Sequence, residues 1–184
     1  KMTMDFKNAG DVIYLVGQSR NDINSSEYLH KIAGIEFSPA PHFELEEEFA
    51  LHRIVEKLIT LKLVLSAHDV SEGGLFITLL ESAFHRDKGF EVATNDRSIR
   101  ADAFWFGEAQ SRVVVSVDES KTGELEKTIR DANIPFKKLG KVTSGPISID
   151  QEDWGAVTEW KNKYDNAISN LLAGHESEHA LAAL

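Results

Sequence analysis

Runs of consecutive apolar residues mark the strands that the sequence predicts. "VIYLV" within 11–17 and "VVVSV" within 111–118 combine β-branched and aromatic residues, and both are bounded by glycine or polar residues. "LVLSAHDV" at 63–70 predicts another buried strand, and "FEVATN" at 90–95 a fourth. Two short strands are expected at 135–143 and 145–150, around Gly140 and Gly145.

Helical spacing of apolar residues is clearest between 44 and 61. Its stripe consists of Leu51, Ile54, Val55, Leu58 and Ile59. The same spacing predicts helices at 71–84, 119–132 and 154–172, and a short one at 25–34. Four glutamates crowd the start of the 44–61 helix, namely Glu44, Glu46, Glu47 and Glu48. They fit either a solvated helix start, where the helix dipole favours negative charge, or a metal-binding group.

Alternating strands and helices indicate an α/β or α+β fold, in which helices pack on a mixed sheet. We expect one domain over residues 1–172. The segment 173–184 has weak packing potential and is expected to be frayed or a helical extension. His175 and His179 lie four residues apart, a spacing that metal ligands use on helices, but no third ligand is evident. No metal site is therefore predicted.

Composition narrows the classes of function. The 184 residues, 42% of them hydrophobic, suffice for one compact domain. The formal net charge of -10 argues against a nucleic-acid surface, which needs clustered Lys and Arg. The chain has no cysteine, so disulfides and thiolate metal sites are excluded and a reducing cytoplasm is expected. No apolar stretch approaches a membrane span, and Lys1 ahead of Met2 suggests a piece of a longer chain.

The stretch "SAHDVSEGGLFITLL", residues 66–80, is the first that can carry chemistry. Gly73 and Gly74 permit positive φ between a buried strand and a helix, whose free N–H groups attract an anion. Ser71 and Asp69 can support such a phosphate-facing turn. They can equally serve only as caps around a tight turn. His68 is either a phosphate contact or general acid, or a core-edge histidine bonded to backbone.

The second stretch is "ADAFWFGEAQSRVVVSV", residues 101–117. Strand alternation would place Glu108, Gln110 and Arg112 on one side. A carboxylate, an amide and a guanidinium together suit a polar ligand with hydroxyl, amide and phosphate groups. The competing interpretation is an internal ion pair with hydrogen bonds at a sheet edge.

Four segments together resemble one family. They are "FKNAGDVIYLVG", "SSEYL", "AHDVSEGGL" and "FGEAQSRVVVSV". In this order they resemble the C-terminal half-domain of phosphoribosylformylglycinamidine synthase, within the aminoimidazole ribonucleotide synthetase-like superfamily. Thiamine-monophosphate kinase, selenophosphate synthetase and a hydrogenase maturation protein share that fold.

The resemblance implies an ATP-dependent ligase of purine biosynthesis. Formylglycinamide ribonucleotide is activated by phosphorylation, and ammonia released from glutamine displaces the phosphate, with Mg²⁺ neutralising the nucleotide charge. Carried over to this chain, Asp69, Ser71, Gly73 and Gly74 would face an interdomain cleft. Glu108 and Gln110 match a Glu-Ser-Gln element that contacts substrate, but Ala109 replaces its serine. The family's ATP and Mg²⁺ ligands lie mainly in N-terminal halves, so no metal ligand is assigned here.

Three functions remain open at this point. The chain is one wall of the synthase site and inactive alone, or a structural or auxiliary nucleotide-binding module, or part of a related phosphate-transferring enzyme. The implied partners are an N-terminal synthetase half-domain, a glutaminase domain or subunit and a small-molecule substrate. No nucleic acid or membrane partner is expected. Apolar surface left bare by the missing half would favour self-association of the isolated chain.

Overall fold

The computed structural model describes residues 1–94 and 98–173. Seven strands form one sheet in the order β2-β4-β1-β5-β3-β6-β7. The pairing of β3 with β6 is parallel and the other pairings are antiparallel, so the predicted mixed sheet is confirmed. The strands are β1 Val12–Val16, β2 Ser66–Asp69, β3 Gly89–Val92, β4 Val113–Val117, β5 Phe136–Thr143, β6 Ser148–Ile149 and β7 Glu152–Asp153.

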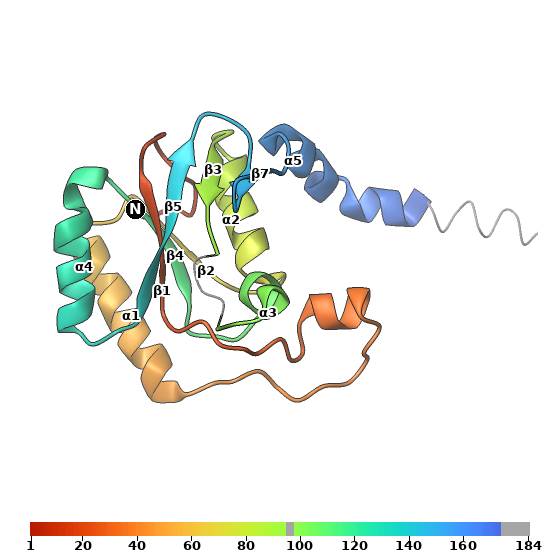
Figure 1. The fold of residues 1–184 in the computed structure, drawn as a ribbon, viewed down its shortest axis with the longest axis horizontal. Coiled ribbons are helices and arrows are strands. Elements are labelled where there is room, and N and C mark those ends of the chain that lie inside the picture. Colours follow the sequence, from red (N-terminus) through yellow and green to blue (C-terminus); the bar gives the residue numbers. More distant parts are fainter. Residues whose placement is uncertain (95–97, 174–184) are drawn as a thin grey trace, which may run out of the picture.

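Helices cover both faces of this sheet (Figure 1). They are η1 Tyr28–Ile32, a π-helical turn, α1 Leu45–Thr60, α2 Gly74–Phe84, α3 Ala101–Phe106, η2 Glu119–Lys121, a 3₁₀ turn, α4 Thr122–Asp131 and α5 Val157–Asp165. Helices α1 and α4 pack on one face, and α2, α3 and α5 pack on the other. None of the described helices has the length and apolar character needed to cross a lipid bilayer.

Burial of both faces of β1 explains why its sequence is apolar at every position and does not alternate with polar residues. Ile13 and Leu15 point into the core beneath α2 and α3, whereas Val12, Tyr14 and Val16 point into the core beneath α1 and α4. Its neighbour β4 divides its valines in the same way. A strand whose two faces are both covered must be apolar at every position.

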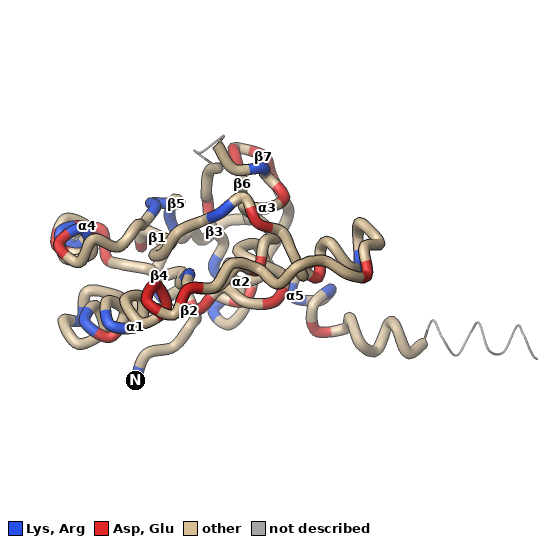
Figure 2. The backbone as a smooth tube through the Cα atoms, turned by 90° about the horizontal axis from the view of Figure 1, so that it is seen from below, with Lys and Arg blue, Asp and Glu red and all other residues tan. Residues whose placement is uncertain are grey.

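Acidic and basic residues are interspersed over the described part of the chain, with no continuous basic stripe along α1 or α4 (Figure 2).

The structure differs from the prediction at two predicted helices and at one helix that was not predicted. The helix expected at 71–84 begins at Gly74, because 71–73 form the turn that precedes it. The helix expected at 154–172 is interrupted at Asn166 and continues over 167–173. Helix α3 was not predicted, because its six residues, rich in aromatic side chains, read as the approach to the valine strand. His175 and His179 lie outside the described residues, as does the tail from 174 onward.

Candidate functional site

A cavity of about 400 Å³ lies where the first turns of α1 meet the end of β2 and the loop 107–112. We refer to it as the site cavity. It is lined by five residues that the sequence analysis predicted to be site residues, namely Asp69, Ser71, Glu108, Gln110 and Arg112. It also includes residues that sequence reasoning did not assign to a site, among them Glu48, His52, Glu72 and Ser111. Glu48 belongs to the acidic start of α1, and Glu72 and Ser111 lie within the two stretches that the sequence analysis named, without having been assigned a role.

The twin-glycine turn does not present free amides. The Gly73 N–H donates to Oε1 of Glu108 at 2.9 Å, and the Gly74 N–H donates to the Ser71 carbonyl at 3.0 Å. The expectation that this turn presents free amides is therefore wrong for Gly73 and Gly74. A phosphate would reach the Gly73 amide only after the Glu108 carboxylate moved away, since both are anions.

Close packing of backbone atoms requires glycine at position 74, independently of any ligand. Its φ is +68°, and a Cβ at this position would lie 2.7 Å from the Trp105 carbonyl oxygen and 2.8 Å from the Gly107 carbonyl oxygen. No side chain fits between α2 and the end of α3 at these distances. The turn therefore brings the tip of α2 against the 105–107 backbone.

Glu108 joins this turn to a distant segment. Its Oε1 also accepts the backbone N–H of Glu27 at 2.8 Å, just before η1. Because a carboxylate oxygen has two lone pairs, one oxygen satisfies both amides. Glu108 thus ties the tip of α2 to the segment that leads into η1, and its carboxylate takes the place that the sequence assigned to a phosphate.

Ser71 does not cap α2. Its hydroxyl donates to Oδ2 of Asp69 at 3.2 Å, and the N-cap position belongs to Gly73, which has a left-handed conformation and offers no side-chain bond. The Asp69 and Ser71 side chains instead face the site cavity. Their hydroxyl–carboxylate pair is exposed, so a ligand can compete for it.

The alternation predicted for 108–112 is wrong. Strand β4 begins only at Val113, and Ser111 has a φ of +62°, which breaks any extended run. The Arg112 side chain is 3% exposed and turns inward. Its Nε donates to the Ala109 carbonyl at 3.0 Å and its Nη2 to the Gly107 carbonyl at 2.6 Å. Arg112 thus shapes the loop that carries Glu108 rather than offering its guanidinium to a phosphate.

Burial also affects the charge of Arg112. Removal from water lowers the pKa of its guanidinium to about 10, and the Asp22 carboxylate opposes that shift. The group therefore stays protonated at neutral pH.

His68 points away from the site cavity. Its Nδ1 lies 3.3 Å from both the Thr78 carbonyl oxygen and the Ser82 hydroxyl, and its Nε2 lies 3.3 Å from Oε2 of Glu81. These partners lie on α2, so the geometry agrees with the core-edge interpretation of this histidine. Ser111, by contrast, donates to Oε2 of Glu48 at 2.5 Å and closes one side of the cavity.

The site cavity is acidic. Glu48, Asp69, Glu72 and Glu108 contribute four negative charges and Arg112 one positive charge, a formal total of -3 with His52 neutral. A bare phosphate would meet net repulsion there, whereas hydroxyl groups can donate to the carboxylates. Within residues 1–94 and 98–173 no cluster of three or more His, Cys, Asp or Glu side chains is arranged to hold a metal ion.

Comparison with known proteins places this geometry in a family. The family model described as "AIR synthase related protein, C-terminal domain" matches residues 8–151. The phosphoribosylformylglycinamidine synthase subunit PurL of Caldanaerobacter subterraneus is 39% identical over 86% of the chain, which spans 24% of that relative. The PurL of Thermus thermophilus is 33% identical over 85% of the chain and 21% of its own length. The chain thus spans about a quarter of the curated relatives it matches.

Solved structures share the fold at lower identity. PurL of Thermotoga maritima, solved in complex with FGAR, superposes with a TM-score of 0.73 at 15% identity, covering 85% of this chain and 29% of that one. Thiamine-monophosphate kinase of Stenotrophomonas maltophilia superposes with a TM-score of 0.58 at 17% identity, covering 83% of this chain and 54% of that one. The fold expected from the sequence resemblance is confirmed, and the chain belongs to the family of AIR synthase related proteins as a C-terminal domain.

Proposed function

We propose that this chain forms one wall of the active site of an ATP-dependent phosphoribosylformylglycinamidine synthase. That enzyme would convert formylglycinamide ribonucleotide, glutamine and ATP to the amidine in cytoplasmic purine biosynthesis. The observation that carries the proposal is the 39% identity to a PurL subunit over 86% of the chain. The site cavity supports it, because Asp69, Ser71, Glu108 and Gln110 face one space.

The chemistry of the cavity limits what this wall can bind. Its carboxylates suit the hydroxyl groups of a substrate, and Gln110 offers both a donor and an acceptor. The residues present do not fit a bare triphosphate, because the formal charge is -3 and the Arg112 donors are engaged by carbonyls. We therefore assign the binding of ATP and Mg²⁺ to an N-terminal synthetase half-domain. From the family resemblance we assign the supply of ammonia to a glutaminase partner.

A second candidate function is a structural or auxiliary nucleotide-binding module. The observation that favours a structural role is the Glu108 carboxylate, which occupies the Gly73 and Glu27 amides in place of a ligand. In that case the domain braces the enzyme while another copy of the same half-domain contacts the substrate. A role in a related phosphate-transferring enzyme has weaker support, since thiamine-monophosphate kinase resembles this chain in fold alone.

A chimeric enzyme tests the proposal. The matching segment of the Caldanaerobacter PurL subunit is replaced by this chain, and ATP-dependent amidine formation is measured with glutamine and the glutaminase partner. We expect turnover to be retained, and to fall at least about tenfold when Gln110, an exposed residue of the site cavity, is changed to Ala. The matched control is Gln151→Ala, an exposed glutamine that does not line this cavity.

The outcomes separate the candidates. A chimera that folds but shows no turnover would contradict the proposal that this chain forms part of a synthase active site. Full turnover in Gln110→Ala, in a chimera of unchanged thermal stability, supports the auxiliary module instead. The 184-residue chain alone is expected to show no turnover, because half a site cannot hold both ATP and acceptor.

A further inference from the structure

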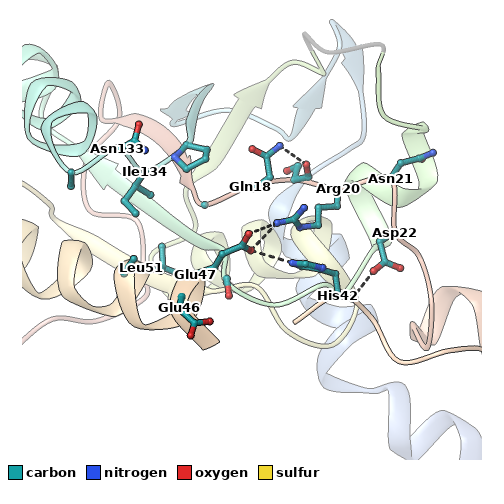
Figure 3. Close-up of a pocket in the computed structure, with 16 residues that line it drawn as sticks. Gln18, Arg20, Asn21, Asp22, His42, Glu46, Glu47, Leu51, Asn133 and Ile134 are labelled. Carbon is teal, nitrogen blue, oxygen red and sulfur yellow. Dashed lines mark hydrogen bonds and ion pairs between the residues drawn. The ribbon is translucent and has the colours of Figure 1, made fainter. Parts of the chain in front are cut away.

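A second cavity, of about 800 Å³, opens at the end of β1 (Figure 3). We refer to it as the strand-end cavity. The loop 17–22, the first turns of α1 and the loop 132–135 form its walls. Its volume falls within the range of small-molecule sites. Leu51 and Ser111 line both this cavity and the site cavity, and the bond from Ser111 to Glu48 lies at their boundary.

Backbone contacts hold the walls in place. Oδ2 of Asp22 accepts the His42 N–H at 2.7 Å, which joins the loop after β1 to the approach to α1. The Gly17 N–H donates to the Pro135 carbonyl at 2.8 Å. Gly17 has a φ of +106°, and a Cβ there would lie 2.0 Å from the Ser111 carbonyl oxygen. The cavity is thus shaped without a ligand, which lowers the entropic cost of binding one.

Glu47 lines the cavity and is held by two neighbouring side chains. Nη2 of Arg20 donates to both of its oxygens, at 2.6 and 2.7 Å, and Nε2 of His42 lies 3.3 Å from Oε2. Figure 3 shows both side chains pointing toward this carboxylate. The hydrogen bond from Arg20 lowers the pKa of Glu47, so the carboxylate is ionised at neutral pH. The three side chains form a hydrogen-bonded polar group in a lining that contains both polar and apolar residues.

The charge of the lining disfavours anionic ligands in this cavity. Asp22, Glu46 and Glu47 contribute three negative charges and Arg20 one positive charge, a formal total of -2 with His42 neutral. A phosphate or carboxylate group would be repelled. An uncharged ligand would not be, and its hydroxyl groups can donate to the exposed face of Glu47.

The remaining lining suits a flat ring with polar edges. Ala50, Leu51, Ile134 and Pro135 provide apolar surface, and the carboxamide groups of Gln18 and Asn133 also line the cavity. The Gln18 Nε2 donates to the Ser19 carbonyl at 2.8 Å, and its Oε1 can accept from a ligand. Carboxylates commonly accept ribose hydroxyls. We propose that the strand-end cavity binds an uncharged nucleoside, with the base against the apolar wall and the sugar hydroxyls toward Glu47. This proposal goes beyond the proposed function and does not depend on it.

Titration of the 184-residue chain with adenosine and with AMP tests the proposal, read out by amide chemical-shift changes in NMR. Adenosine should bind saturably at millimolar concentration and shift the amides of the loop 17–22 and of residues 133–134. AMP, which adds only the phosphate, should bind at least about fivefold more weakly, since repulsion between two unit charges about 4 Å apart in water is worth about 1 kcal/mol. Putrescine serves as the probe for a cation site.

Charge variants sharpen the test. The double variant Glu46→Gln/Glu47→Gln brings the formal charge of the lining to zero, so AMP affinity should rise toward that of adenosine. Glu56→Gln, an exposed residue further along α1, is the matched control and should leave the preference for adenosine intact. Circular dichroism confirms that each variant is folded.

Three results would overturn the proposal. In the first, adenosine causes no saturable chemical-shift change. In the second, adenosine shifts only residues outside the strand-end cavity. In the third, AMP binds the unaltered chain as tightly as adenosine does. Binding of putrescine at the same residues without adenosine binding would identify a site for cations instead. None of these results bears on the chimera experiment, which measures amidine formation.

Discussion

Oε1 of Glu108 accepts the backbone N–H of Gly73 at 2.9 Å, although the two residues lie 35 positions apart in the chain. The same oxygen accepts the Glu27 N–H at 2.8 Å. A single carboxylate therefore fastens the start of α2 to the segment before η1. The negative charge at this helix tip comes from the domain itself, which is favourable to the helix dipole.

Removing the Glu108 carboxylate should loosen both segments. We expect Glu108→Ala to lower the free energy of unfolding by about 1–2 kcal/mol, because two amides lose a charged acceptor in a partly exposed setting. Amide hydrogen exchange at Gly73 and Glu27 should accelerate. Urea denaturation and exchange measured by NMR provide both readouts.

Glu108→Gln is the matched control for that variant. Its amide oxygen can still accept both N–H groups but carries no charge, so the loss should be smaller than in Glu108→Ala. Unchanged exchange at Gly73 in the alanine variant would show that the carboxylate does not hold the turn in solution.

Gly74 should be intolerant of any side chain. Gly74→Ala places a methyl group within 2.8 Å of the Trp105 and Gly107 carbonyl oxygens at a φ of +68°. We expect a loss of about 2 kcal/mol or more, since backbone must shift to relieve the contact. Thermal unfolding followed by circular dichroism measures it.

Gly123 provides the opposite case. It lies exposed in α4, where a Cβ would meet nothing within 4 Å. Gly123→Ala should stabilise the domain by about 0.5–1 kcal/mol through helix propensity. Equal effects of the two substitutions would contradict the packing argument for Gly74.

The regular elements were predictable because their patterns are local. The apolar stripe of α1 predicted residues 44–61, and the helix runs from Leu45 to Thr60. The apolar runs of β1 and β4 indicated strands buried on both faces, which the two helical layers confirm. The sequence also identified five residues that line the site cavity.

The contacts inside the site were not predictable in this way. Arg112 was expected near a ligand because strand alternation would place it on the same side as Glu108 and Gln110, yet it is 3% exposed. Its burial depends on carbonyls that the loop presents only after α3 has formed and Ser111 has adopted a positive φ. Likewise, the pairing of Glu108 with Gly73 depends on tertiary structure that no local pattern encodes.

Arg112 should be essential for the conformation of the loop 107–109. Arg112→Met keeps much of the buried volume but leaves the Gly107 and Ala109 carbonyls without their donor. We expect a loss of about 2–4 kcal/mol, because buried carbonyls lose charged hydrogen bonds. Arg112→Lys should lose a similar amount, since an ammonium cannot reproduce the two-pronged contact.

Arg53→Met is the control for these arginine variants. Arg53 is exposed on α1, so its replacement should change the free energy of unfolding by no more than about 0.5 kcal/mol. Urea denaturation of all three variants decides the matter. If Arg112→Lys were as stable as the unaltered chain, charge alone and not the geometry of the guanidinium would account for the role of Arg112.

The contribution of Tyr14 to the free energy of unfolding should decrease at alkaline pH. Its hydroxyl donates to Oε1 of Glu126 at 2.8 Å, and its side chain is buried in β1. Burial, and then the hydrogen bond to Glu126, raise the pKa of Tyr14 well above its ordinary value of 10.0. Tyr14→Phe should cost about 1 kcal/mol at neutral pH, the typical net value of such a bond.

The pH dependence follows from the direction of that shift. Because the folded chain holds the Tyr14 proton more tightly than the unfolded chain, this contribution is fully present below pH 10.0 and is lost as the pH rises toward the folded pKa. The stability difference between the unaltered chain and Tyr14→Phe should therefore shrink above pH 10.0. Glu126→Gln keeps an acceptor and should leave the pKa of Tyr14 raised by burial. Because the chain has three tyrosines, tyrosinate absorbance is compared between the unaltered chain and Tyr14→Phe, and the difference reports the titration of Tyr14. A Tyr14 that ionised at its ordinary pKa would refute this account.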